Sequence, residues 1–215
     1  MAASLGAEVC EIYTDVEGVF TADPAICPTA RKIDRISFEE MLEMASTGAK
    51  VLQIRSVELA KKFNVPVHVR SSLTETEGTW LIEEEEGMDS VLVSGVTCEK
   101  DEAKITLLRV PDRPGLAAQI FTPISESSIV VDMIIQNASE DGTTDLTFTV
   151  PKADYKQAIS LVEKTAAAVE ARGVAADPHI AKVSIVGVGM RTHAGVATKM
   201  FQVLAREGIN VEMIS

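Results

Sequence analysis

Apolar and polar positions in the first part of the chain predict a strand, a long loop and then a helix. The run AEVCEIY at residues 7–13 predicts a short buried strand. A helix is predicted from Ser37, because Glu40 completes a capping-box pattern ahead of apolar residues at helical spacing. Gly48 is expected to end this helix, since glycine readily adopts the left-handed conformation found at helix C-termini.

A second helix and a second strand follow. Ser56 is expected to cap a helix over residues 57–64, VELAKKFN, and the stretch VPVHVRSS predicts an alternating strand at 65–70. A strand, a loop, helices and a further strand form a βαβ-like crossover. The first part of the chain is therefore expected to contain a parallel sheet.

The rest of the chain contains an internal repeat. KITLLRVPDRPGLAAQIFTPISESSIVVDMII at 104–135 aligns with residues 182–215, and each copy has the pattern of strand, glycine-containing turn, amphipathic helix and strand. The first copy continues with an alternating strand at 143–150 and a helix over 154–173, which gives βαββα. A period of about 80 residues has the size of a domain and is too long for a solenoid. The second copy stops at Ser215, so we expect its domain to be incomplete in this chain.

A run of glutamates separates the two parts. EEEEG at 83–87 is a stretch of like charges that repel one another and attract water, so we expect a linker and a domain boundary there. An acidic metal-binding loop is the alternative, but contiguous carboxylates converge on one ion only where a turn aligns them.

The amino-acid composition indicates the fold class and argues against one class of partner. The chain has 46% hydrophobic residues and few aromatic ones, which suits α/β layers built from aliphatic side chains. A formal charge of −12 without a basic patch argues against nucleic acid as a partner.

The spacing of the cysteines and the hydropathy of the chain indicate the cellular compartment. Three widely spaced cysteines indicate neither a disulfide framework nor a metal pair, and favour a reducing cytoplasm. No uninterrupted apolar run is long enough to span a membrane, and the N-terminus lacks the pattern of an export signal.

One glycine-rich motif and the three histidines are better interpreted as structural features than as binding sites. GVGMRTHAG at 187–195 resembles a phosphate-binding loop, but it occupies the position of VPDRPG in the first repeat, which favours a plain strand-to-helix turn. His68, His179 and His193 have no second ligand at metal-binding spacing, so we expect structural or surface histidines.

The turn DRPGLA at 112–117 has two interpretations. Pro114 and Gly115 before a helix leave N–H groups free to receive a carboxylate, and Asp112 and Arg113 offer polar contacts to an α-amino group or an acid. Alternatively, Pro-Gly only forms the turn and Asp112 caps the helix. The residues alone leave both open.

Two long stretches resemble a known family. TDVEGVFTADP at 14–24, followed by residues 37–72, resembles the last third of the catalytic domain of the aspartate kinases, members of the amino-acid kinase family. DRPGLA and QNASEDGTTDLTFT at 136–149 are similar to elements of the family's ACT regulatory domains.

The resemblance covers essentially the whole chain and implies an α/β fold. The end of an amino-acid-kinase α/β domain would occupy residues 1–82. A first ACT domain, ferredoxin-like with βαββαβ topology, would occupy 83–180 together with the acidic linker. The start of a second, incomplete ACT domain would occupy 181–215.

The resemblance also implies a nucleotide site for ATP with Mg²⁺. Its residues in this sequence would be Thr14, Asp15, Phe20, Asp23 and Lys50, the last reaching the site from the following helix. A cation there would serve phosphoryl transfer, which depends on positioning and charge stabilisation. Two positions depart from the family pattern, with Phe20 in place of tyrosine and Ala25 in place of an arginine that can contact phosphate.

An amino-acid effector, lysine or threonine, is implied at the ACT domains. The expected effector-binding residues are Asp112, Arg113, Pro114, Gly115, Leu116, Ala117, Gln136 and Asn137. ACT sheets in the family pair edge to edge, so a homo- or hetero-oligomer is expected.

Three functions follow from these features. The first is a segment of an aspartate kinase, which phosphorylates the β-carboxylate of aspartate on the way to lysine, threonine and methionine. The family's Lys-Phe-Gly-Gly type opening has no counterpart here, so this chain alone is expected not to catalyse. The second is a non-catalytic regulatory subunit, and the third is an amino-acid-binding ACT module unconnected with a kinase.

Overall fold

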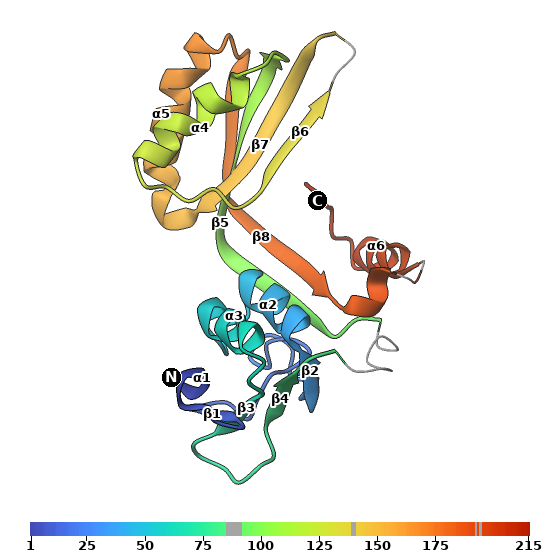
Figure 1. Cartoon of the computed structure of the whole chain (residues 1–215). Helices are drawn as coiled ribbons and strands as arrows, with labels where there is room; N and C mark the ends of the chain where they lie inside the picture. Colours follow the sequence, from blue (N-terminus) through green and yellow to red (C-terminus); the bar gives the residue numbers. More distant parts are fainter. Residues whose placement is uncertain (85–91, 139–140, 192, 194) are drawn as a thin grey trace. The chain divides into compact units, whose positions relative to one another are not determined.

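The computed structural model describes residues 1–84, 92–138, 141–191, 193 and 195–215. The chain divides into two compact units, which are described one at a time (Figure 1). The first unit comprises Met1–Cys98 and Val183–Ile214, and the second comprises Glu99–Lys182 with Ser215. Of the glutamate run at 83–87, only Glu83 and Glu84 are among the described residues, and the remainder of the expected linker lies outside them.

The first unit contains a four-stranded sheet with the order β1-β3-β4-β2. Its elements are α1 (Ala2–Leu5), β1 (Cys10–Thr14), β2 (Arg35–Ser37), α2 (Phe38–Ser46), α3 (Ile54–Lys62), β3 (Val67–Ser71) and β4 (Thr79–Ile82). Strands β1 and β3 are parallel, with Cys10 opposite Val67, so the predicted crossover is confirmed. Strand β4 pairs antiparallel with β3 and parallel with β2; neither β2 nor β4 was predicted.

The start of helix α2 forms the predicted capping box. The Ser37 hydroxyl accepts a hydrogen bond from the Glu40 N–H, and the Glu40 carboxylate accepts one from the Ser37 N–H, each at 3.2 Å. The helix ends at Ser46, shortly before Gly48, whose φ of 116° is in the region that favours glycine.

The prediction for the start of helix α3 is wrong by a few residues. Helix α3 begins at Ile54, with Gln53 and not Ser56 at its N-cap. The Ser56 N–H donates to the Gln53 carbonyl at 2.9 Å, so Ser56 lies in the first helical turn. The side chain of a capping residue has to precede the free N–H groups that it satisfies, and Ser56 follows them.

A hydrophobic core packs α2 and α3 against the sheet of the first unit. Its most buried members come from both helices, from the strands and, for Val19, from the loop after β1: Val19, Ile36, Phe38, Met41, Met44, Val57, Val67, Val69 and Leu81. The alternation predicted for residues 65–70 places Val67 and Val69 in this core and His68 on the other side of β3.

The second unit contains the βαββαβ topology. Its elements are β5 (Gly95–Pro111), α4 (Leu116–Glu126), β6 (Ile134–Ala138), β7 (Thr143–Pro151), α5 (Tyr155–Ala168) and β8 (Gly173–Val186), and the sheet order is β6-β7-β5-β8. Strand β7 pairs antiparallel with both β5 and β6. Strands β5 and β8 each contribute residues to both units.

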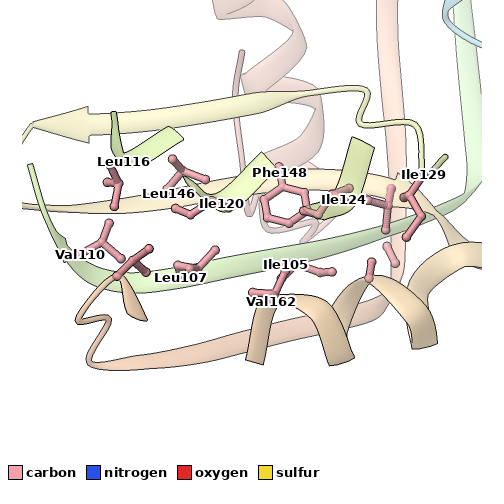
Figure 2. Close-up of a cluster of buried hydrophobic side chains, with 14 residues drawn as sticks. Ile105, Leu107, Val110, Leu116, Ile120, Ile124, Ile129, Leu146, Phe148 and Val162 are labelled. Atoms are coloured by element: carbon pink, nitrogen blue, oxygen red, sulfur yellow. The ribbon is translucent and has the colours of Figure 1, made fainter. Parts of the chain in front are cut away.

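Helices α4 and α5 cover one face of this sheet (Figure 1). Figure 2 shows the core between them, where Ile120 and Ile124 of α4 and Val162 of α5 meet Ile105 and Phe148 of the strands. These side chains are at most 1% exposed, so each of the two helices presents apolar residues to the sheet, as the amphipathic pattern predicted for the first of them requires.

The second repeat begins like the first and then departs from it. Helix α6 (Val196–Arg206) starts after Gly195, whose φ of 101° resembles the 88° of Gly115 before α4. The stretch from 187 to 195 therefore connects strand β8 to helix α6, as the strand-to-helix interpretation predicts, with a 3-10 turn at Val188–Arg191.

The strand predicted after this helix is not formed. Residues 209–215 have no regular structure. The Ile209 N–H turns back to the Leu204 carbonyl at 2.8 Å, and no strand among the described residues pairs with this segment. A strand is stable only with a neighbour for its backbone hydrogen bonds.

Candidate functional site

The carboxyl ends of β1 and β3 form one candidate site. The two strands are parallel and Thr14 lies opposite Ser71, so both end at the same edge of the sheet. A pocket of about 390 Å³ opens beside this edge, lined by Tyr13, Arg70, Ser71, Ser72, Leu73, Thr74 and Glu75. Parallel α/β sheets commonly bind ligands at the carboxyl ends of their strands.

Thr14 and Asp15 lie next to this pocket. The Thr14 carbonyl accepts from both the N–H and the hydroxyl of Ser72, at 2.7 and 3.0 Å, which ties the end of β1 to the lining segment. The Thr14 hydroxyl donates to the Asp15 carboxylate at 3.1 Å. Asp15 is exposed, so the remaining acceptor positions of its carboxylate face solvent.

Arg70 brings a positive charge to the pocket wall. Its Nη1 is 3.4 Å from Glu11 Oε1, and its guanidinium carbon is 5.8 Å from the centre of the Tyr13 ring. Its Nε is buried and has no hydrogen-bond partner among the residues that the structure describes. A buried donor without a partner is uncommon, and this one is on a residue that lines the pocket.

The loop after β1 is held against strand β4. The Val19 N–H donates to the Thr79 hydroxyl at 2.8 Å. Gly18 has a φ of 139°, and a Cβ atom at this position would lie 2.5 Å from that same hydroxyl. The glycine in TDVEGVF is therefore required both by backbone conformation and by space.

Phe20 and Asp23 lie further along this loop and do not line the pocket. Phe20 forms an antiparallel bridge with Lys32. The Asp23 carboxylate accepts from the Ala25 N–H at 2.9 Å, and its carbonyl accepts from the Cys27 N–H at 2.8 Å, so TADP makes a tight polar turn.

Lys50 differs from the expectation. It is exposed and lies in the connection between α2 and α3, not on a helix. The helix ends earlier because the Ala49 N–H turns back to the Met44 carbonyl at 2.8 Å. Lys50 does not line the pocket either.

Arg70, Ser72 and Thr74 line the pocket although they were not predicted as site residues. These residues end the alternating strand predicted at 65–70 or follow it directly, and the predicted crossover makes β3 parallel to β1. Polar residues just after the second strand of such a unit were therefore the available signal.

His68 has the environment of a structural histidine. It is 6% exposed and its ring stacks on Trp80, with the ring centres 3.9 Å apart. Burial lowers the pKa of His68, and the nearby Arg70 charge acts in the same direction. Among the described parts of the chain, no group of three or more metal-ligating side chains is placed to hold an ion.

The turn before α4 forms a second candidate site, at one end of the second unit. The Gln136 side chain on β6 donates to the Asp112 carboxylate at 3.2 Å. Helix α4 has Gly115 at its N-cap and no side-chain capping bond, so Asp112 does not cap it. The Asp112 N–H donates to the Gly142 carbonyl at 2.9 Å, which fixes the turn against the loop before β7.

The remaining residues expected to bind the effector have different environments. Arg113 pairs with Glu170 at 3.2 Å, and Pro114, Gly115 and Ala117 are exposed. Leu116 is 3% exposed and its side chain belongs to the core, so only its backbone belongs to the turn surface.

Asn137 is exposed on β6. Its backbone carbonyl accepts from the Thr144 hydroxyl at 2.5 Å, a bond that does not involve its side chain.

A helix long and apolar enough to cross a membrane is not found in the described part of the chain.

Family models match three stretches of the chain. The amino acid kinase family matches residues 1–71, and ACT domain models match residues 104–167 and 183–215.

Similar proteins cover all three stretches. An aspartate kinase from Pseudomonas putida is 57% identical over 216 residues, which cover all of this chain and 53% of that protein. The chain thus spans about half the length of the curated relatives that it matches.

Solved structures of aspartate kinases also match the chain. E. coli aspartokinase III in complex with aspartate and ADP matches with a TM-score of 0.80 and 30% identity, over 99% of this chain and 47% of that one. The same enzyme with lysine and aspartate gives a TM-score of 0.78 at 29% identity, over 100% and 47%. The regulatory subunit of aspartate kinase from Thermus thermophilus is 41% identical, with a TM-score of 0.54, over 58% of this chain and 82% of that one. The chain therefore belongs to the aspartate kinase family, in which it joins an amino-acid kinase segment to ACT domains.

Proposed function

We propose that the chain is a segment of an ATP-dependent aspartate kinase, which phosphorylates the β-carboxylate of aspartate in the first step of lysine, threonine and methionine biosynthesis. The segment contributes part of the nucleotide site and the ACT region for feedback regulation by an amino acid. The family membership and the E. coli relative solved with aspartate and ADP support this proposal.

One observation carries the nucleotide part of the proposal. Parallel strands β1 and β3 place Thr14 and Asp15 beside a pocket that also carries an arginine and several hydroxyl groups. The guanidinium of Arg70, whose Nε has no partner among the described residues, is a hydrogen-bond donor of the kind that phosphate oxygens accept from, whereas the Ser72 hydroxyl already donates to the Thr14 carbonyl. The pocket therefore suits a polyphosphate ligand.

Arg70 and Asp15 would have different roles in nucleotide binding. ATP with Mg²⁺ supplies the phosphoryl group when it is bound. Arg70 would hold a phosphate through its planar guanidinium, and the exposed Asp15 carboxylate would accept from ribose hydroxyls or attract the cation. Phosphoryl transfer depends mainly on such positioning and charge stabilisation.

Titration calorimetry of the chain with Mg-ADP tests this proposal. We expect saturable binding that Asp15→Asn weakens by about tenfold or more, because a bond to a charged acceptor is lost. Glu58→Gln is the matched control, since Glu58 is an exposed carboxylate on helix α3, away from the pocket lining. Absence of binding, or equal weakening by both variants, would contradict the proposal.

We propose in addition that the turn at Asp112 binds an amino-acid effector, lysine or threonine. The hydrogen bond between Asp112 and Gln136 carries this proposal, because it holds a carboxylate acceptor beside the N-terminus of α4, whose N–H groups attract a carboxylate. An α-amino acid carries both complementary groups. The E. coli relative solved with lysine supports the proposal.

A regulatory subunit without catalytic activity is the second candidate. The Thermus regulatory subunit favours it, because this chain covers most of that subunit. Strand β6 lies at the edge of its sheet, and an edge strand offers unpaired backbone groups to a second copy or a partner chain. In this candidate, effector binding would persist where Mg-ADP binding is absent.

A further inference from the structure

Glu40 has more partners than a capping box requires. It is 4% exposed, and its Oε2 accepts from the N–H and the hydroxyl of Ser37 at 3.2 and 3.0 Å. Its Oε1 accepts from the Ser94 hydroxyl and, at 3.5 Å, from the Val188 N–H. A buried carboxylate is stable only when its oxygens are satisfied, and here the donors come from three separate segments of the first unit.

The segment around Ser94 connects two further parts of the first unit. The Ser94 N–H donates to the Val186 carbonyl at 2.8 Å, at the end of β8. The Val96 N–H donates to the Thr21 carbonyl, also at 2.8 Å. Thr21 directly follows Phe20 in the loop that the family resemblance assigns to the nucleotide. Residues 94–96 therefore lie between the second ACT repeat and this loop.

Two glycines near this segment, Gly95 and Gly187, are closely packed. A Cβ atom on Gly95 would lie 2.8 Å from Met44 Cε of helix α2, and one on Gly187 would lie 2.5 Å from the Leu92 carbonyl. Gly95 thus lies against the Met44 side chain of α2, and Gly187 lies against the backbone of Leu92 and Val93. Closely packed elements move together because they cannot deform independently.

We propose that Glu40 is a positioning residue that couples the second ACT repeat to the nucleotide loop and to the start of helix α2. A displacement of residues 186–188 would move Ser94 through Glu40 and the β8 hydrogen bond, and Val96 would carry the movement to Thr21. This inference rests on the proposed function, since the loop that it couples to the second ACT repeat belongs to the proposed nucleotide site.

Hydrogen exchange of the whole chain tests the coupling. Glu40→Gln replaces one carboxylate oxygen by an amide group that cannot accept, and Ser94→Ala removes one donor only. In both variants we expect amide exchange at residues 19–23, 94–98 and 186–190 to be about tenfold faster or more, while exchange in helix α3 stays unchanged. If Glu40→Gln fails to fold, the exchange rates of Ser94→Ala alone test the coupling.

Ser37→Ala is the matched control. It breaks the capping box but leaves the contacts of Glu40 Oε1 to Ser94 and Val188. We expect faster exchange only in the first turn of α2. The proposal is overturned if exchange at residues 19–23 stays at the wild-type rate in Ser94→Ala, or if Ser37→Ala accelerates it equally.

A Mg-ADP titration of the same variants separates the two proposals. We expect Ser94→Ala to weaken Mg-ADP binding several-fold although Ser94 does not line the pocket. Wild-type chain that does not bind Mg-ADP would refute the proposed nucleotide site, and the exchange result would still decide the coupling. Wild-type binding with an unchanged affinity in Ser94→Ala would overturn the role of Glu40.

Discussion

Gln136 Nε2 donates a hydrogen bond to Asp112 Oδ1 over 3.2 Å and thereby joins strand β6 to the turn before helix α4. The bond orients the carboxylate at one end of the sheet. It brings together two motifs that are 24 positions apart in the sequence.

Asp112→Ala should therefore weaken the binding of lysine or threonine by about tenfold or more, because the α-amino group loses a charge-assisted partner. Gln136→Ala should have a smaller effect, since the carboxylate remains but is no longer oriented. Titration calorimetry with each amino acid measures both. Asp101→Ala is the control, as Asp101 is an exposed carboxylate elsewhere on β5. An affinity that responds to Asp101→Ala as strongly as to Asp112→Ala would exclude a specific site at the turn.

Gly18→Ala should lower the free energy of unfolding by about 1–3 kcal/mol, because the left-handed backbone is strained by a side chain and the new methyl group meets Thr79. The hydroxyl that it meets accepts the Val19 N–H. Urea denaturation measures the change. Gly6→Ala is the control for backbone strain alone, since Gly6 has a φ of 64° and no described atom lies within 4 Å of the place that its new methyl group would take. Equal losses in both variants would show that the contact with Thr79 contributes nothing.

Arg70→Gln should weaken Mg-ADP binding by about tenfold or more, because the pocket loses its guanidinium donors. Arg70→Lys should restore only part of the affinity, since an ammonium group cannot make the same planar, bidentate contact. Titration calorimetry measures both variants. Arg55→Gln on helix α3 removes the same charge at an exposed position and should have no effect. Binding that is insensitive to Arg70→Gln would remove this arginine from the site.

Glu102→Gln should make the chain more stable near neutral pH. Burial raises the pKa of the Glu102 carboxyl above its usual 4.5, while the Thr149 hydroxyl and the Lys182 charge oppose the shift. A carboxyl whose pKa is raised on folding stabilises the fold below the usual pKa and loses this contribution as the pH rises through the folded value.

The wild-type chain should thus lose stability relative to Glu102→Gln between pH 4.5 and neutral pH. Urea denaturation of both proteins across this interval measures the difference. Glu99→Gln is the control on the same strand. A stability difference that does not change with pH would mean that Glu102 keeps an ordinary pKa in the folded chain.

Local sequence patterns predicted the structure correctly where the interacting residues are close together in the sequence. The capping box of Ser37 and Glu40 and the glycine-containing turns before α4 and α6 depend on a few adjacent residues, so they could be predicted. The alternation of Val67, His68 and Val69 likewise follows from strand geometry.

The strands that were predicted wrongly or not at all also have physical explanations. Strands β2 and β4 are short and are stabilised by their neighbours in the sheet, a pairing that no local pattern encodes. Residues 209–214 have a strand-like composition, yet they form no strand because no partner lies beside them among the described residues. Strand formation requires a partner, which composition alone does not provide.

The sequence by itself determined the family, the order of the elements and the turns that carry the candidate residues. Only the tertiary structure decided which of those residues meet, because their partners are remote in sequence. Asp112 and Gln136 are 24 positions apart, and Glu40 and Val188 are 148 apart. Contacts over such separations depend on the packing of the whole unit, which hydrophobic burial drives without regard to sequence distance.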